Sequence, residues 1–186
     1  MNDPLRQIQA WALAQGATHA LPVTDRAYLI AQEYVRAACL QNACGHSGRC
    51  WTCPPHVGEF DELAARLLAY PGVLVVQSIT ALEDSWDFEA MTAAAQAHNT
   101  LLRELGHRAA AAFPACAVLA LGCGGCGFCA SCTCPDAPCR FPAEALGSVE
   151  GYGLDVKALV ESVGLHYING KGTVSFVGAV LISCPE

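Results

Sequence analysis

Ten of the twelve cysteines of this chain lie in two short segments, which run from Cys39 to Cys53 and from Cys123 to Cys139. The second segment holds a ladder of cysteines separated by two residues each, followed by two more: Cys123, Cys126, Cys129, Cys132, Cys134 and Cys139. Three thiolates with this spacing, together with a more distant fourth thiolate near a proline, are typical of a loop that wraps a [4Fe–4S] cluster. The second segment therefore predicts a metal site and favours an iron–sulfur cluster.

Zinc is the main alternative metal for this segment, because two pairs of cysteines in C-x2-C spacing also form a tetrahedral site of four thiolates. Structural zinc sites usually place the two pairs many residues apart, whereas here the ladder is continuous. The glycines Gly124, Gly125 and Gly127 between the cysteines would also let backbone N–H groups approach cluster sulfides without a Cβ in the way. Both observations favour iron–sulfur chemistry over zinc.

The first segment has four thiols within fifteen residues, but their spacing is less regular: Cys39, Cys44, Cys50 and Cys53. These four residues could hold a [4Fe–4S] cluster or a zinc ion. Trp51 is placed to cover such a site from water. His46 and His56 lie within or beside the segment, and we expect them to pack in the loop rather than to bind metal.

The local charge of the first segment differs from that of the whole chain. The net charge is −7, yet residues 36–58 contain two arginines, two histidines and no carboxylate. A cluster with its thiolates is negatively charged, so a positive surrounding stabilises it and tunes its potential. We therefore predict that Arg49, and Arg140 beside the last cysteine of the second segment, contact the cofactors. A solvated side chain or a bond to a loop carbonyl is the alternative role for each arginine.

Both segments match a known pattern. The motif C-x4-C-x8-C-P-P begins at Cys39, and C-x2-C-x2-C-x6-C-R-F-P begins at Cys126; a glycine-rich hairpin signal closes the chain after Glu150, Gly153 and Asp155. With these motifs the chain resembles the predicted metal-binding proteins called domain of unknown function 2284. The resemblance covers nearly the whole chain and implies metal binding.

The resemblance also implies how the cysteines divide between two sites. The first site would take Cys39, Cys44 and Cys53. The second site would take Cys126, Cys129, Cys132 and Cys139. Cys50, Cys123 and Cys134 are additions to the family pattern. The first site therefore either takes Cys50 as its fourth ligand or has only three thiolates and an exposed iron.

Composition limits the class of protein. At 186 residues and 53% hydrophobic content, the chain can bury a substantial core as one globular domain, residues 1–186, with cysteine loops at 39–55 and 122–142. The first ten residues lack a secretory signal and no stretch is long and apolar enough to span a membrane, so we expect a cytoplasmic protein with no membrane partner. The acidic charge argues against nucleic acid as a partner. Compartment and size also argue against a disulfide scaffold as the main role of the cysteines.

Hydrophobic periodicity predicts an α/β domain with a mixed sheet flanked by helices. Helices are predicted at 4–15, 59–70, 87–112 and 155–162, with a helix interruption near Gly106 and less regular helix at 25–38 and 142–150. Strands are predicted at 18–23, 73–80, 117–121 and 173–183. The turn at 169–172 predicts a closing β-hairpin in which residues 165–168 pair with the last strand.

We therefore expect an iron–sulfur protein with two [4Fe–4S] clusters, one on Cys126, Cys129, Cys132 and Cys139 and the other on Cys39, Cys44, Cys53 and Cys50. Its expected role is electron transfer with a protein redox partner, as an oxidoreductase or an accessory electron carrier. One alternative is an enzyme that activates a small-molecule substrate on an open three-cysteine cluster. Another is a zinc-stabilised interaction module. The sequence assigns no catalytic residue, since it contains no familiar nucleophile or nucleotide-binding motif.

Overall fold

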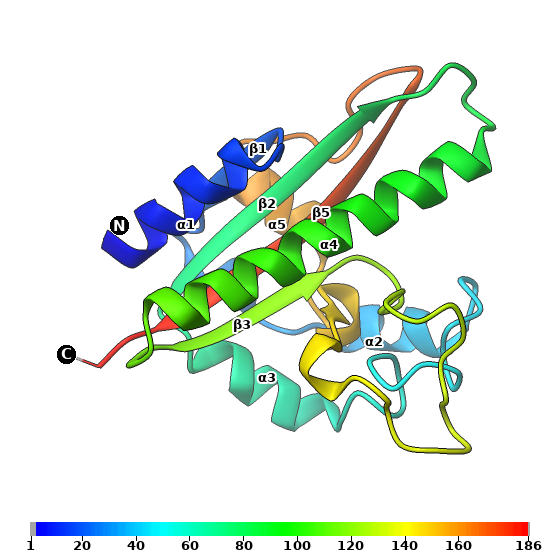
Figure 1. The fold of residues 1–186 in the computed structure, drawn as a ribbon, viewed down its shortest axis with the longest axis horizontal. Helices are drawn as coiled ribbons and strands as arrows, with labels where there is room; N and C mark the ends of the chain where they lie inside the picture. The colour runs from blue at the N-terminus through cyan, green and yellow to red at the C-terminus, as the bar shows by residue number, and fades with distance from the viewer. Residues whose placement is uncertain (1–2, 186) are drawn as a thin grey trace.

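The computed structural model describes residues 3–185, which form a single α/β domain around a five-stranded mixed sheet (Figure 1). Residues 1, 2 and 186 of the predicted domain lie outside the described part. The strands follow the order β1-β2-β5-β3-β4, in which β3 and β4 are parallel and the other neighbours antiparallel. Their bounds are His19–Pro22 (β1), Gly72–Ala81 (β2), Ala117–Gly122 (β3), Gly147–Ser148 (β4) and Thr173–Ser183 (β5).

Five α-helices and three short 3₁₀ helices surround this sheet. The α-helices are Asp3–Ala14 (α1), Glu33–Leu40 (α2), Phe60–Leu68 (α3), Phe88–Ala112 (α4) and Val156–Ser162 (α5). The 3₁₀ helices are Arg26–Leu29 (η1), Pro142–Glu144 (η2) and Glu150–Tyr152 (η3). Among residues 3–185, no helix combines the length and apolar character needed to cross a membrane.

Alternate residues of the long central strands face opposite sides, so the sheet carries a core on each face. Leu74 of β2 packs on one face in a buried cluster with residues of α1 and α4, such as Ile8 and Leu102. Val75, the next residue, belongs to the cluster on the other face, with residues of α3 and α5 such as Leu67. The helices therefore form one layer on each side of the sheet (Figure 1).

The predicted fold class is confirmed, and the long helix is more regular than its sequence suggested. Asp87 caps α4 by accepting a hydrogen bond from the backbone N–H of Ala90 at 2.8 Å. The helix then continues to Ala112 without a break at Gly106. A Cβ at Gly106 would lie 2.9 Å from the Cβ of Ala120, so this glycine instead lets α4 lie close to β3.

Two further local expectations are wrong. Residues 165–168 form no strand, because both edges of β5 are already hydrogen-bonded to β2 and β3, which leaves no backbone groups for the predicted closing hairpin. The helix expected at 142–150 is replaced by η2, the two-residue strand β4 and the start of η3. β4 takes the free edge of β3, and this pairing requires extended backbone within that segment.

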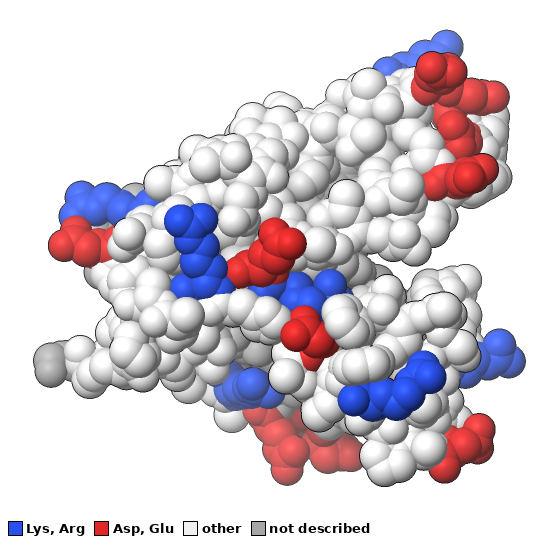
Figure 2. Space-filling model, viewed as in Figure 1, with Lys and Arg blue, Asp and Glu red and all other residues white. Residues whose placement is uncertain are grey.

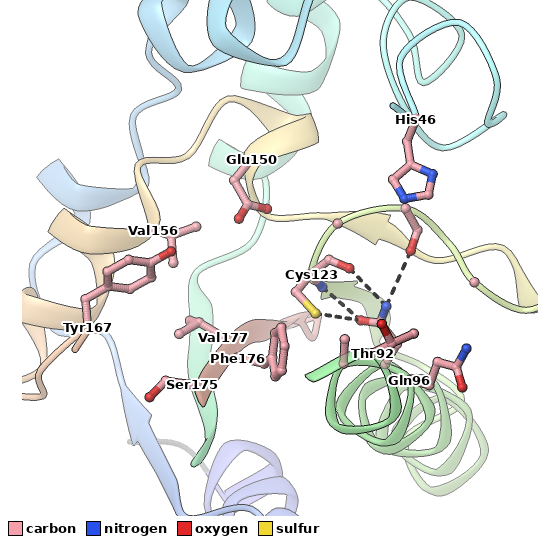
Figure 3. A pocket seen from close by; sticks show the side chains of 15 residues that line it. His46, Thr92, Gln96, Cys123, Glu150, Val156, Tyr167, Ser175, Phe176 and Val177 are labelled. Carbon is pink, nitrogen blue, oxygen red and sulfur yellow. Dashed lines mark hydrogen bonds between the residues drawn. The ribbon is translucent and has the colours of Figure 1, made fainter. Parts of the chain in front are cut away.

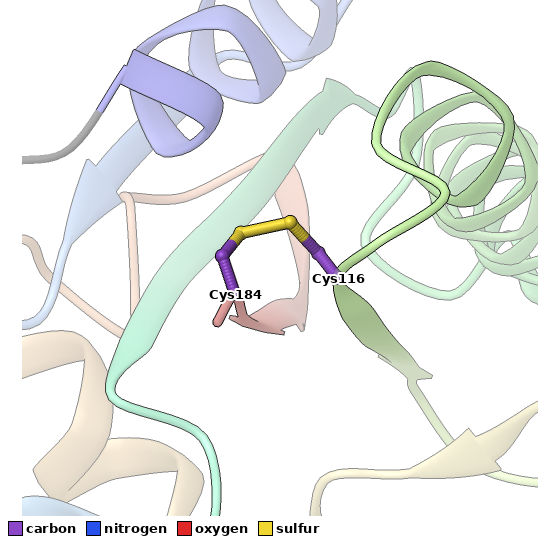
Figure 4. Close-up of a disulfide and its surroundings, with 2 residues drawn as sticks. All are labelled: Cys116 and Cys184. Atoms are coloured by element: carbon purple, nitrogen blue, oxygen red, sulfur yellow. A yellow bond between two sulfur atoms is a disulfide. The ribbon is translucent and has the colours of Figure 1, made fainter. Parts of the chain in front are cut away.

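The two cysteines outside the segments form a disulfide, a bond that the sequence had not assigned (Figure 4). Cys116 and Cys184 flank the last described pair between β3 and β5, Ala117 and Ser183. Antiparallel pairing therefore brings their Cα atoms to 4.1 Å, although 68 positions separate them in sequence. Such bonds are rare in cytosolic proteins, and the cytoplasmic location stays a prediction.

We expect the Cys116→Ala/Cys184→Ala double variant to lose about 4 kcal/mol of unfolding free energy, because the bond closes a loop of 68 positions in the unfolded chain. Guanidinium unfolding measures this loss. Either single variant should lose nearly as much as the double variant, since each alone breaks the bond. Additive single losses would mean that the sulfur atoms contribute by packing and not through a covalent link.

Candidate metal centre

The two cysteine segments lie against each other beside η2 and α2 (Figure 1). The indole N–H of Trp51 donates to the carbonyl of Ala137 at 3.0 Å. The thiol of Cys134 contacts the carbonyl of Gly48, with 3.8 Å between sulfur and oxygen. The two loops, about seventy residues apart in sequence, therefore form one unit.

Three thiols of the first segment line one cavity of about 290 Å³, here called cavity A. They are Cys39, Cys44 and Cys53. Cys39 lies in the last turn of α2, whereas Cys44 and Cys53 come from the loop that follows this helix. Glu150 and Gly124 complete the wall toward the second segment.

Helix α2 holds Cys39 in place through contacts with η3 and α5. The guanidinium of Arg36 donates to the carbonyls of Gly151 at 3.0 Å and Gly58 at 2.7 Å. The hydroxyl of Tyr34 donates to the carboxylate of Asp155, which also caps α5. This hydrogen bond lowers the pKa of Asp155. Arg36 thus has a structural role at the edge of cavity A.

Five thiols line a second cavity of about 220 Å³, here called cavity B. They are Cys50, Cys126, Cys129, Cys132 and Cys139. Four of them are the predicted ligands of the second site. The fifth, Cys50, belongs to the first segment but faces the second. Aromatic side chains close the rim, where the rings of Phe128 and Phe141 meet edge to face with centroids 5.3 Å apart.

Cys50 and Cys53 connect the two cavities. Both are buried, and a hydrogen bond between their side chains lowers the pKa of Cys50 to about 4 while it raises that of Cys53. The Thr52 hydroxyl and the Cys50 sulfur form a further hydrogen bond at 3.3 Å, and the backbone of Cys126 forms another with this sulfur. Cys50 is therefore the more acidic thiol of the pair that lies between cavities A and B.

Helix α4 holds the start of the second segment through two polar side chains that no sequence motif singled out. Asn99 is buried; its amide donates to the carbonyl of Cys123 at 2.9 Å and its oxygen accepts from the N–H of Cys123 at 2.9 Å. Arg103 donates to the carbonyls of Glu144 at 2.8 Å and Cys126 at 3.1 Å. Because both side chains bind backbone atoms, no cysteine pattern could reveal them.

The two arginines predicted to contact the cofactors and the two histidines of the first segment have the following surroundings. Arg49 lines cavity B. Arg140 donates to the carbonyl of Ser131, which is the loop-carbonyl role given as its alternative. His56 packs edge-on against Trp51, with ring centroids 5.0 Å apart, as expected for loop packing. His46 packs against Gly125, where an added Cβ would lie 2.9 Å from its ring.

Charged side chains are unevenly distributed over the surface. Acidic side chains gather at the tip where β2 leads into α4, within the segment Glu-Asp-Ser-Trp-Asp-Phe-Glu at 83–89 (Figure 2). Both basic and acidic side chains lie near the cysteine loops in the same view. Only residues 36–58 combine two arginines with no carboxylate, which favours a negatively charged group at the first segment.

The cysteine thiols line two cavities and do not surround a single point. Within residues 3–185, no group of three or more His, Cys, Asp or Glu side chains is arranged to hold a single metal ion. Instead, several thiols line each of the two cavities.

Comparison with known proteins gives one match. A family model described as predicted metal-binding protein (DUF2284) matches residues 24–182, a range that includes both cysteine segments. No curated protein and no solved structure matches the chain.

We expect Trp51→Phe to lower the unfolding free energy by about 1 kcal/mol, because the carbonyl of Ala137 loses its donor while the aromatic bulk is kept. Urea unfolding followed by circular dichroism measures the change. Trp86→Phe is the matched control, since Trp86 is 75% exposed. Equal losses in the two variants would show that the Trp51 hydrogen bond does not help to join the loops.

Proposed function

Because the chain belongs to the DUF2284 family of predicted metal-binding proteins, we propose that it binds metal as two iron–sulfur clusters, one in each thiol-lined cavity. The observation that carries this proposal is the donor set, in which thiols from separate parts of the chain line cavities A and B. Iron–sulfur clusters are held by thiolates. Cys126, Cys129, Cys132 and Cys139 would hold the cluster of cavity B. Cys39, Cys44 and Cys53 would hold that of cavity A.

Hydrogen bonds to sulfur support this assignment. The backbone N–H of Leu146 donates to the sulfur of Cys126 at 3.5 Å. Such N–H bonds stabilise cluster thiolates and raise the reduction potential. The residues present therefore fit iron–sulfur clusters, which would supply one-electron redox chemistry to the protein.

Electron transfer is the function that we propose for the pair of clusters. Cys50 lines cavity B and Cys53, in the same loop, lines cavity A, so two clusters held there would be neighbours. Cys132 at cavity B is exposed, and Phe128 and Phe141 beside it are 43% and 48% exposed. This edge is where a protein redox partner would approach.

A second candidate function is favoured by the composition of cavity A. Its wall holds three thiols, because Cys50 lines cavity B instead. A cluster with three thiolates keeps one iron free for a substrate, which it can polarise as a Lewis acid. In that case the protein is an enzyme, and the cluster of cavity B supplies electrons or structure.

Metal analysis after anaerobic purification tests the proposal. We expect about eight iron and eight acid-labile sulfide ions per chain, the content of two [4Fe–4S] clusters. Cys129→Ser should lose half of this content through cavity B, and Cys39→Ser the other half through cavity A. Cys134→Ser should keep all of it, because Cys134 lines neither cavity.

Three outcomes contradict parts of this picture. One zinc ion per site without sulfide would replace the redox function by a zinc-stabilised interaction module. Loss of all iron in Cys129→Ser would show that the two sites share ligands or fold together. An unchanged iron content in both ligand variants would exclude the proposed ligands.

The charge of Arg49 provides a further test. We expect Arg49→Gln to lower the reduction potential of the cluster in cavity B by tens of millivolts, since a lost positive charge disfavours the more negative reduced state. Redox titration followed by EPR measures the potential. Arg6→Gln is the control, because Arg6 lies on α1, where it pairs with Asp3. Equal shifts in both variants would exclude a local effect of Arg49.

A further inference from the structure

A third cavity, of about 430 Å³, lies beside the cysteine loops and is here called cavity C (Figure 3). α4 contributes Gln96 to its wall, β5 contributes Phe176, and the segment before β5 contributes Tyr167. The start of the second cysteine segment contributes Cys123. A hollow between α4 and the cysteine loops is visible on the surface (Figure 2). Its volume is in the range of small-molecule sites.

Glu150 carries an unsatisfied polar atom at this cavity. Its Oε2 is buried and has no hydrogen-bond partner among residues 3–185. The carboxyl group points into the space between Tyr167 and Cys123 (Figure 3). A buried carboxylate oxygen without a partner costs free energy, which a bound donor would recover.

The groups around this oxygen indicate the chemistry of the missing partner. The rings of Tyr167 and Phe176 face the same cavity as the carboxyl group (Figure 3). Aromatic faces attract organic cations, and a carboxylate supplies the opposite charge. No Lys or Arg is among the described residues that line cavity C, where His46 is the one basic side chain.

We propose that cavity C binds a small organic ammonium compound, whose charged nitrogen donates to Oε2 of Glu150 while its carbon atoms contact Tyr167 and Phe176. A carboxylate or a phosphate would find no Lys or Arg in this wall and would lie beside the acidic Glu150. An alcohol would satisfy the hydrogen bond but would leave the charge of Glu150 unpaired.

The location of Glu150 connects this ligand with the metal centre. Glu150 and Gly124 line both cavity A and cavity C, and His46 lines both cavity B and cavity C. The shared wall places a compound bound in cavity C next to cavity A. This link rests on the proposed function: for an enzyme with an open cluster in cavity A, the ammonium compound would be the substrate class. The binding site itself requires no metal.

Calorimetric titration of the anaerobically purified protein tests the binding site. The probes are n-butylammonium, n-butanol and butyrate, which share one carbon chain and differ in charge. We expect saturable binding of butylammonium at least about tenfold tighter than that of either other probe, a difference of about 1.4 kcal/mol. Equal or tighter binding of butyrate or butanol overturns the proposal, as does the absence of saturable butylammonium binding.

Two variants with matched controls locate the bound probe. Glu150→Gln keeps the size of the side chain and should weaken butylammonium binding at least about tenfold. Glu161→Gln, on the exposed surface of α5, should change it less than about twofold. Gln96→Trp should fill the mouth of cavity C and abolish binding, whereas Ala97→Trp, at the next exposed position of α4, should preserve it. Unchanged binding in Glu150→Gln or Gln96→Trp overturns the proposal.

A spectroscopic measurement separates this proposal from the proposed function. In Cys129→Ser, which should keep only the cluster of cavity A, butylammonium should shift the EPR signal of the reduced cluster. Iron and sulfide are determined in each sample. Butylammonium binding without iron would leave the binding site standing and reject the clusters. Clusters without butylammonium binding would leave the proposed clusters standing and reject the binding site. Butylammonium binding without an EPR shift would reject the link between cavities A and C.

Discussion

The hydrogen bonds between Asn99 and the backbone of Cys123 are the constraint on which the metal centre depends. They fix the point where β3 ends and the second cysteine loop begins, so that the loop leaves the sheet beside α4. Gly122 shows how little space this arrangement leaves, because a Cβ there would lie 2.2 Å from Oδ1 of Asn99. The rigid layers of the fold thus determine where flexible loop backbone can place its thiols.

The first cysteine loop obtains its position from the opposite side of the sheet. α2 has no fully buried residue, and its hydrogen bonds to η3 and α5, not a hydrophobic face, hold it against the domain. The two loops then meet through the side chains of Trp51, Cys134 and Cys50. Since each loop depends on backbone partners in the other, a group bound in either cavity would also stabilise its neighbour.

The sequence predicted most of the fold because its apolar residues recur with clear helical or strand periods. Prediction from the sequence failed where pairing between distant strands decides the local structure. Residues 165–168 form no strand, because β2 and β3 occupy both edges of β5. Motif spacing divided the cysteines between two predicted sites but could not show that Cys50 lines cavity B with thiols of the second segment, since that orientation depends on contacts between loops. The Cys116–Cys184 disulfide could not be predicted from motif spacing either, because it follows from strand register alone.

Glu150 is the residue at which these separate constraints meet. It begins η3, whose carbonyl at Gly151 anchors Arg36 of α2, and its carboxyl group lies between cavities A and C. Burial raises the pKa of this carboxyl group, partly offset by hydrogen bonds from its own backbone and from Ser148. A protein that only needed to stabilise its fold would gain by placing an apolar residue there. An acidic side chain with a free oxygen beside a thiol-lined wall is therefore better explained by a bound partner than by packing.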